Sequence, residues 1–388
     1  MTSQLILSSQ EVHDSRRQQI MQERATRTAD DLRKQTGILG VVLSGSVARG
    51  PVGGSSDLDS YVIVSHEFTG SLPEWTFHRE GIIENLHTIR EDELLCGWRV
   101  RNNSASLASW FHKTKLGDEL HRFLPLWWNS YTKWQERLPV LVSLRQNPDI
   151  AQMIARCYTE SARAHMHQAH NACDENTPYD SHHYLRLAFQ TALTAAMVYR
   201  GWIIRGSKKR IEIAQAFLPD PLIKLLLVVG FDIVGLNDMT SNRAMKLCKA
   251  RLHYRTTLLC ELRKLKAQYA DDEYAASKFE AAIKHQEKHN AMAYDYYSSL
   301  LAQNIILGPI NHIRCFSGLP QVPRLLLISC LHRESPWPMH EFVQSDIVSR
   351  AVRDTWLEIM ALTSSRQRCI QLSSMLSKAL NKLVSHIT

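Results

Sequence analysis

Residues 41–64 read VVLSGSVARGPVGGSSDLDSYVIV, and this stretch determines the fold that we expect for the first part of the chain. Two apolar runs flank a turn of small residues, so the pattern predicts a strand, a turn, a short helix and a second strand. Asp57 and Asp59 stand at the start of the second strand. Because side chains alternate along a strand, the two carboxylates share one face and Leu58 points to the other.

Two carboxylates so close together repel each other, and a divalent cation is the usual means of keeping both ionised. Gly45 allows the backbone to approach a ligand closely, and a helix that starts after Ser46 would present N–H groups to a phosphate. The stretch therefore predicts a cation site beside a phosphate site, as nucleotidyl transfer requires. The alternative is that Asp57 is an ordinary turn residue and that Asp59 lies on an exposed strand face.

The combination of Gly-Ser, a spacer and Asp-x-Asp between apolar strands resembles the signature of the polymerase-beta-like nucleotidyltransferase superfamily. This resemblance implies a third acid on a neighbouring strand. Residues 75–79 and 82–89 are strand-like on either side of Glu80-Gly81, which we interpret as a hairpin turn. Glu84 lies within the second run and is the expected third acid, with Glu80 as the second choice. The alternative is an exposed glutamate on an edge strand.

With Glu84, the resemblance narrows to the antibiotic (aminoglycoside) nucleotidyltransferases, which carry a comparable glutamate within a late strand. It implies that this residue completes the metal site or takes the proton from the substrate hydroxyl. The predicted catalytic and metal-binding residues are Asp57, Asp59 and Glu84. The predicted nucleotide-binding residues are Gly45, Ser46, Arg49, Ser56, Lys208 and Lys209.

A second informative stretch is residues 185–219, in which a helix rich in small and apolar residues ends near Arg200-Gly201 and a basic connector follows. Lysine acts as a mobile point charge on phosphate, so the connector suits a triphosphate. The resemblance extends to this region and implies that one lysine contacts phosphate. Lys208 is the best match and Lys209 is the alternative. The other interpretation is a basic loop in solvent that binds no phosphate.

Glu160 lies on the preceding predicted helix, near the border of its apolar stripe. Some relatives use an acid of the helical domain as the general base. The resemblance therefore makes Glu160 an alternative to Glu84 in that role, while an ordinary surface glutamate is the simpler interpretation.

Composition describes an ordinary globular protein. The 388 residues suggest about two or three domains, and 44% hydrophobic with 22% charged residues does not favour disorder. The net charge of +8 favours anionic ligands such as a nucleoside triphosphate without establishing nucleic-acid binding. The eight cysteines form no C-x-x-C pair, and no signal peptide or membrane span is evident, so we predict a cytoplasmic protein with no membrane partner.

The predicted fold class is α+β, with a small mixed-sheet nucleotidyltransferase domain followed by an all-helical domain. The expected domains are 1–103, 104–310 and a helical C-terminal extension at 311–388 whose role is unknown. An opening helix is predicted at 10–35, ended by Gly37, and strands are predicted near 38–44, 57–64, 75–79 and 82–89. Helical periodicity is best at 149–173, 181–201, 240–268, 272–303, 345–361 and 366–385.

The expected reaction is the transfer of a nucleoside monophosphate, most simply AMP from ATP, to an acceptor hydroxyl with two Mg²⁺ ions. The resemblance makes a small molecule such as an aminoglycoside-type antibiotic the first choice of acceptor. The helical region shows no acidic cluster for such a polycation, so a protein side chain or an RNA end is the second enzymatic choice. A third reading is a nucleotide sensor that has kept the fold without catalysis.

Overall fold

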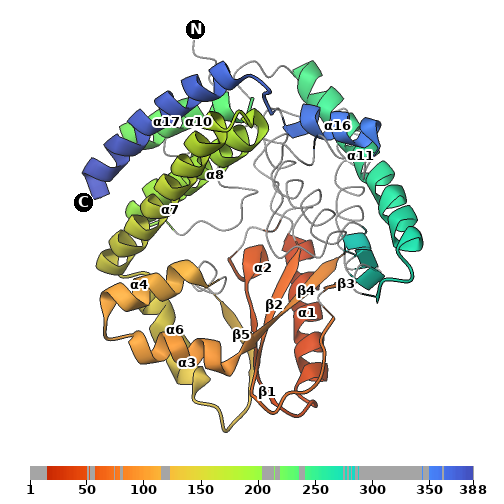
Figure 1. Cartoon of the computed structure of the whole chain (residues 1–388). Coiled ribbons are helices and arrows are strands. Elements are labelled where there is room, and N and C mark those ends of the chain that lie inside the picture. Colours follow the sequence, from red (N-terminus) through yellow and green to blue (C-terminus); the bar gives the residue numbers. More distant parts are fainter. Residues whose placement is uncertain are drawn as a thin grey trace. The chain divides into compact units, whose positions relative to one another are not determined.

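The computed structural model describes residues 15–49, 52, 57–73, 75–78, 82–114, 123–202, 214, 219–235, 241–273, 276–277, 279–280, 282–284, 287, 343, 349–360 and 362–387. The chain divides into two compact units, Met1–Met153 and Ile154–Thr388 (Figure 1). The predicted α+β class is confirmed, because the first unit contains a mixed sheet and the second unit is helical in its described residues.

The sheet of the first unit has five strands in the order β3-β4-β2-β1-β5. β2 and β4 are parallel, and the other neighbouring strands are antiparallel. The strands are β1 (Ile38–Leu43), β2 (Leu58–Val64), β3 (Trp75–Phe77), β4 (Ile83–Arg90) and β5 (Leu124–Trp128). β3 and β4 pair in antiparallel fashion, as the predicted hairpin requires, while its turn at residues 80 and 81 lies outside the described residues.

One face of the sheet is covered by α1 (Ser15–Leu32), which Figure 1 shows beside the strands. The buried residues of α1 recur at helical spacing and are Met21, Ala25, Ala29 and Leu32. They pack against one set of alternating strand residues, including Leu43, Leu58, Val41 and Val62. The face of the sheet that α1 covers is therefore fixed by these contacts.

The other helices of the first unit follow the sheet in the chain. They are α2 (Gly45–Arg49), α3 (Glu91–Val100), α4 (Ser104–Lys113) and α6 (Trp134–Arg145). Gly97 of α3 lies against the ring of Trp110 of α4, where a Cβ atom would approach Cζ2 to 2.6 Å. The fully buried Trp134 of α6 donates its indole N–H to Glu91 Oε1 of α3 at 2.9 Å. These contacts join the three longer helices to one another.

β5 was not predicted from the sequence, and it extends the sheet beyond the boundary predicted after residue 103. It pairs with β1 along Gly40–Leu43, and the ring of Trp128 covers Gly40 so closely that a Cβ atom there would lie 2.3 Å from Trp128 Cε3. The sequence did not predict this strand, because a tryptophan such as Trp128 fits many kinds of packing and its partner Gly40 is distant in the sequence. Residues 104–153 therefore belong with the sheet rather than with the helical region.

In the described part of the second unit, the helices match those predicted near 149–173, 181–201, 240–268, 345–361 and 366–385, and α10 was not predicted. Most of the helix predicted at 272–303 lies outside the described residues. The described helices are α7 (Pro148–Asp174, which starts in the first unit), α8 (Pro178–Tyr199), α10 (Pro221–Ile233), α11 (Ser241–Gln268), α16 (Arg350–Met360) and α17 (Arg366–Ile387). α8, α10 and α17 pack against one another. Arg156 of α7 donates to the Ile387 carbonyl at 3.1 Å, which ties α7 to the end of α17.

The connection from α8 to α10 shows why the chain turns there. Gly201 ends α8 with a φ of +78°, a conformation that favours glycine at a helix C-terminus. Asp220 begins α10 by accepting from the N–H groups of Leu222 at 2.8 Å and Ile223 at 3.2 Å, and Arg200 forms an ion pair with it at 2.6 Å. Burial alone would raise the pKa of Asp220, but these partners outweigh it and hold the pKa below its ordinary value.

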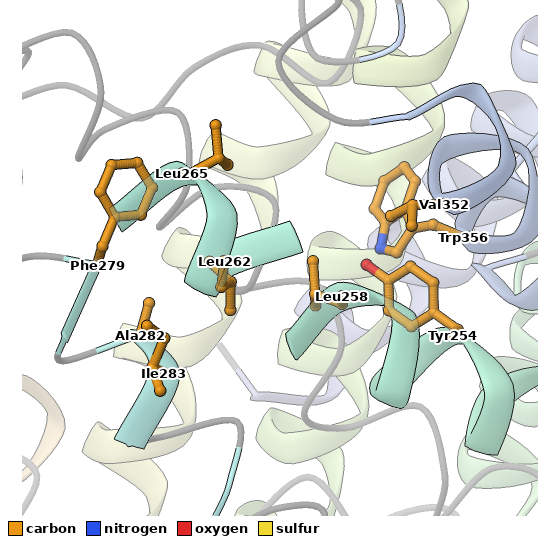
Figure 2. Close-up of a cluster of buried hydrophobic side chains, with 9 residues drawn as sticks. All are labelled: Tyr254, Leu258, Leu262, Leu265, Phe279, Ala282, Ile283, Val352 and Trp356. Atoms are coloured by element: carbon orange, nitrogen blue, oxygen red, sulfur yellow. The ribbon is translucent and has the colours of Figure 1, made fainter. Parts of the chain in front are cut away.

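A separate apolar cluster joins α11 to α16 (Figure 2). Tyr254, Leu258 and Leu262 recur along one face of α11, and Val352 and Trp356 of α16 pack with them. The cluster is completed by Leu265 of α11 and by Phe279, Ala282 and Ile283. Its periodicity of three to four residues is what made α11 predictable from the sequence.

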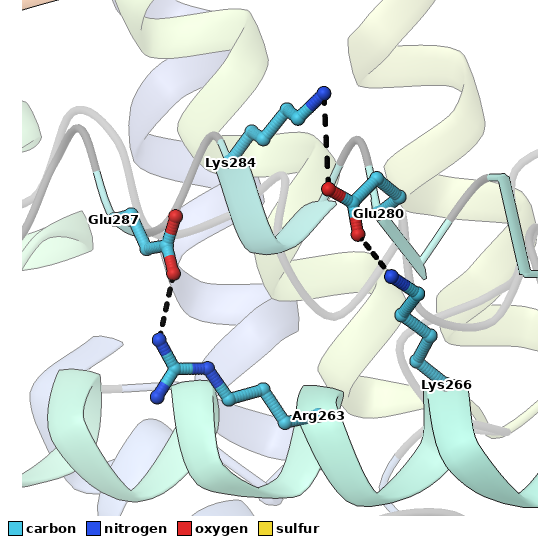
Figure 3. A network of polar contacts seen from close by, with 5 residues as sticks. All are labelled: Arg263, Lys266, Glu280, Lys284 and Glu287. Carbon is cyan, nitrogen blue, oxygen red and sulfur yellow. Dashed lines mark hydrogen bonds and ion pairs between the residues drawn. The ribbon is translucent and has the colours of Figure 1, made fainter.

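Ion pairs connect α11 to residues 280–287 on the polar side (Figure 3). Arg263 contacts Glu287 at 2.7 Å, and Glu280 contacts both Lys266 and Lys284. The hydrogen bond from Lys266 and the charges of both lysines lower the pKa of Glu280, although burial opposes this. All five side chains are well exposed, so the network contributes little to stability.

Among the described residues, no helix has both the length and the apolar character needed to cross a membrane.

Candidate functional site

The site begins where β2 begins. Asp57 immediately precedes the strand and Asp59 is its second residue, so the two side chains lie on the same face of the sheet. This is the face away from α1, because Leu58 packs with Met21 and Ala25 on the other side. The Asp59 side chain is 23% exposed, so it is partly accessible to a ligand.

The turn that ends β1 lies directly against Asp59. Ser44 donates its backbone N–H to the Asp59 carbonyl at 2.8 Å, and Gly45 follows with a φ of +69°. A Cβ atom on Gly45 would lie 2.6 Å from Asp59 Oδ2. Glycine is required here for two reasons, the left-handed backbone and the close approach of the carboxylate. The predicted proximity of the Gly45 turn and the aspartates is therefore observed.

β4 supplies the neighbouring polar side chains of this face. The parallel register places Asn85 opposite Asp59 and His87 opposite Tyr61. Asn85 Nδ2 donates to Asp57 Oδ2 at 3.0 Å and to Asp59 Oδ1 at 2.8 Å. His87 Nε2 lies 3.5 Å from Asp59 Oδ1, and its ring stacks on Tyr61 with centroids 4.8 Å apart.

Glu84, the predicted third acid, lies on the opposite face of the sheet, so the prediction that it faces the aspartates needs correction. It is opposite Leu58 in the register and only 2% exposed. Its Oε2 accepts from Thr28 of α1 at 3.0 Å, contacts His78 Nε2 at 2.9 Å and lies 3.9 Å from Arg24 Nε. The carboxylate therefore joins α1 and the end of β3 to β4.

The physical reason for this correction is the two-residue period of the strand. Residues 84 and 86 share one face and residues 85 and 87 share the other. Leu86 is buried against Ala29 and Leu32 of α1, which assigns Glu84 to the α1 face. The sequence contained a signal that could have shown this, because an acid two residues from a buried leucine belongs to the covered face. Asn85 and His87 are the functional candidates that sequence reasoning missed.

The remaining predicted residues are placed incompletely or not at all. Ser46 and Arg49 belong to α2, and their side chains lie outside the described part of the chain. Ser56, Glu80, Lys208 and Lys209 also lie outside the described residues. Glu160 is an exposed residue of α7 in the second unit.

The donor set of this face suits a hard divalent cation in part. Carboxylate oxygens are the ligands that Mg²⁺ prefers. The carboxylates of Asp57 and Asp59 lie close to each other, since both accept a hydrogen bond from the same atom, Asn85 Nδ2. Across the described residues, however, no group of three or more His, Cys, Asp and Glu side chains is arranged to hold a metal ion. A cation at this place would thus need further oxygen atoms from its ligand or from water.

Comparison with known proteins gives limited information. No protein-family model matches the chain, and no curated protein matches it. Among solved structures, it is similar to a nucleotidyltransferase-like protein from Exiguobacterium sibiricum 255-15, with 15% sequence identity, 88% of each chain covered and a TM-score of 0.30. A similarity of this degree carries no argument about the reaction, which must be inferred from the site itself.

Proposed function

We propose that this chain is a metal-dependent nucleotidyltransferase, which moves a nucleoside monophosphate from a nucleoside triphosphate to a hydroxyl group. One observation supports this above all. Asp57 and Asp59 lie side by side on the face away from α1, with the glycine turn at Gly45 against one of them. A carboxylate pair beside a glycine turn combines a place for a cation with backbone that a phosphate can approach.

Asp57 and Asp59 would hold Mg²⁺, which typically takes one or two carboxylates together with phosphate oxygens. The bound ion would supply charge neutralisation at the phosphates and stabilise the entering and leaving oxygens. Gly45 keeps the space beside Asp59 clear, since any side chain there would collide with its carboxylate.

The acceptor hydroxyl must lose its proton when it attacks the phosphorus atom. Glu84 is unsuited to this role because its carboxylate is buried on the α1 face. His87 shares the face of Asp59 and its side chain is 26% exposed, so its imidazole is the better candidate among the described residues. Glu160 of the second unit stays an untested alternative.

The finer parts of the proposal concern the donor and the acceptor. ATP is the simplest donor, and the nucleotide-binding residues proposed from the sequence are Ser46, Arg49, Ser56 and either Lys208 or Lys209. The acceptor would be a small hydroxylated molecule such as an aminoglycoside-type antibiotic. A protein side chain or an RNA end is the enzymatic alternative, supported by the net charge of +8.

A second candidate function is a nucleotide-binding protein without catalysis. It is supported by the position of Glu84, which leaves the site face with two acids among the described residues. Two carboxylates can hold a nucleotide-bound cation without completing a catalytic site.

The test is incubation of the full chain with ATP labelled at the α-phosphate, Mg²⁺ and a panel of aminoglycosides, RNA and cell lysate. Label on a small molecule, on RNA or on a protein band would identify the acceptor class. Binding of ATP without any transfer would support the second candidate.

The matched variants for this test are the double substitution of Asp57→Asn with Asp59→Asn, and Thr88→Ala as a control. Thr88 is an exposed residue of β4 on the face away from the aspartates. The double variant is expected to abolish transfer and the control to retain it. Transfer at the wild-type rate by the double variant would refute the assignment of these residues.

A further inference from the structure

The position of Asn85 between the two aspartates has a consequence for cation binding. Asn85 is 4% exposed and stands directly opposite Asp59 in the β2–β4 register. Its single amide nitrogen lies 3.0 Å from an oxygen of Asp57 and 2.8 Å from an oxygen of Asp59. An amide N–H₂ carries two donors, so one group can serve both carboxylates at once. The amide thus occupies one oxygen of each carboxylate.

Hydrogen bonds to an ionised carboxylate are short and strong; the 2.8 Å bond to Asp59 has such a length, and the 3.0 Å bond to Asp57 has an ordinary one. A cation that binds through Asp57 Oδ2 and Asp59 Oδ1 must displace or reorient this amide. Glu84 cannot compensate with a third negative charge, because its side chain lies on the α1 face. The site therefore offers a cation two carboxylates and a competing donor.

We infer that Asn85 is a positioning residue, whose amide competes with a divalent cation for Asp57 and Asp59 and so makes cation binding depend on the phosphate oxygens of a nucleoside triphosphate. This inference rests on the proposed function and adds to it the order of binding. The cation enters with the nucleotide rather than ahead of it. Ligand charge and number set the affinity of such sites, and here the nucleotide supplies what the protein lacks.

Three single variants of the full chain separate this role from general electrostatics. Asn85→Asp removes the competing donor and adds a third carboxylate to the face of Asp57 and Asp59. Asn85→Ala removes the donor without adding charge. Thr88→Asp is the matched control, because it adds the same charge to an exposed position of the same strand on the opposite face.

The measurement is free Mn²⁺ by electron paramagnetic resonance during titration, with and without the non-transferable analogue α,β-methylene-ATP. Without nucleotide, Asn85→Asp is expected to bind Mn²⁺ at least about tenfold more tightly than wild type, a difference of about 1.4 kcal/mol. Asn85→Ala is expected to bind about threefold more tightly, and Thr88→Asp within about twofold of wild type. In wild type, the analogue should tighten Mn²⁺ binding by about tenfold or more.

The inference is overturned if Asn85→Asp binds Mn²⁺ no more tightly than Thr88→Asp, or if Asn85→Ala binds it more weakly than wild type. In the second case the amide would assist cation binding rather than compete with it. If Asn85→Asp does not fold, judged by circular dichroism, Asn85→Ala decides alone. Wild type that binds the analogue but holds Mn²⁺ equally well without it also overturns the inference. Failure to bind any nucleotide would refute the proposed function instead, whatever the variants do without nucleotide.

Discussion

His182 of α8 should make the helical unit lose stability in acid, because its hydrogen bonds require a neutral imidazole. Nε2 contacts the Ile233 carbonyl at 2.7 Å, so this nitrogen carries the proton. Nδ1 accepts from the Thr363 N–H at 2.8 Å, so this nitrogen must be unprotonated. The ring is 3% exposed and connects α8 to the end of α10 and to the segment before α17. A second proton would face the Thr363 N–H and break that bond.

Burial lowers the pKa of His182 from 6.5 to about 4, assisted by the positive charges of Arg186 and Arg368, while the bond to Ile233 opposes the change. Between these two values the unfolded chain binds a proton that the folded chain excludes. Stability is therefore complete above about pH 6.5 and falls as the pH decreases toward 4. At about 1.4 kcal/mol for each pH unit, the loss between pH 7 and pH 4 is about 3 kcal/mol.

The perturbation is His182→Gln, whose amide can donate to Ile233 but does not titrate. At pH 7 we expect the variant to be less stable than wild type by about 1–3 kcal/mol, since the bond from Thr363 is lost. At pH 4 the variant should be as stable as wild type or up to about 2 kcal/mol more stable, because wild type has lost about 3 kcal/mol that the variant keeps. The assay is urea unfolding followed by circular dichroism at several pH values between 7 and 4.

The matched control is His386→Gln, because His386 is an exposed histidine near the end of α17. This control should keep the pH dependence of wild type. The reasoning would be refuted if His182→Gln and wild type lost the same free energy of unfolding between pH 7 and pH 4.

Three further substitutions test single contacts. Gly45→Ala should destabilise the first unit by about 1–2 kcal/mol through its φ of +69°, and should weaken nucleotide binding measured by calorimetry because its Cβ displaces Asp59; unchanged affinity would contradict the close approach. Asp220→Ala should cost about 1–2 kcal/mol in urea unfolding at pH 7, and since the pKa of Asp220 is lowered, this difference should shrink as acid protonates the wild-type carboxylate; a constant difference would count against it. Gly230→Ala should lower stability by about 1–3 kcal/mol, because its Cβ would meet the ring of Phe189 at 2.0 Å; a melting temperature equal to wild type would exclude this.

The sequence was sufficient where local chemistry determines local structure. The apolar runs before Ser44 and after Leu58 became β1 and β2, and the aspartates took the predicted place at the start of β2. Helical periodicity predicted α11 within a residue at its start, because its buried residues line one face. Gly37, expected to end the first helix, has a φ of +85° but lies beyond the end of α1 at Leu32.

The sequence was insufficient where the outcome depends on pairing between distant segments. The face of Glu84 is set by the register of β4 against β2, and a shift of one residue would have exchanged it with Asn85. β5 is a strand because β1 lies open beside it and Gly40 leaves room for Trp128. The residues of β4 and β5 do not themselves indicate that these strands pair with β2 and β1.

The central claim is that Asp57 and Asp59 hold the cation that accompanies a nucleotide. Calorimetric titration of wild type and of the variant with both Asp57→Asn and Asp59→Asn, with α,β-methylene-ATP and Mg²⁺, tests it most directly. We predict that wild type binds the analogue only when Mg²⁺ is present and that the double variant loses this Mg²⁺-dependent binding. Equal Mg²⁺-dependent affinity in the two proteins would contradict the claim.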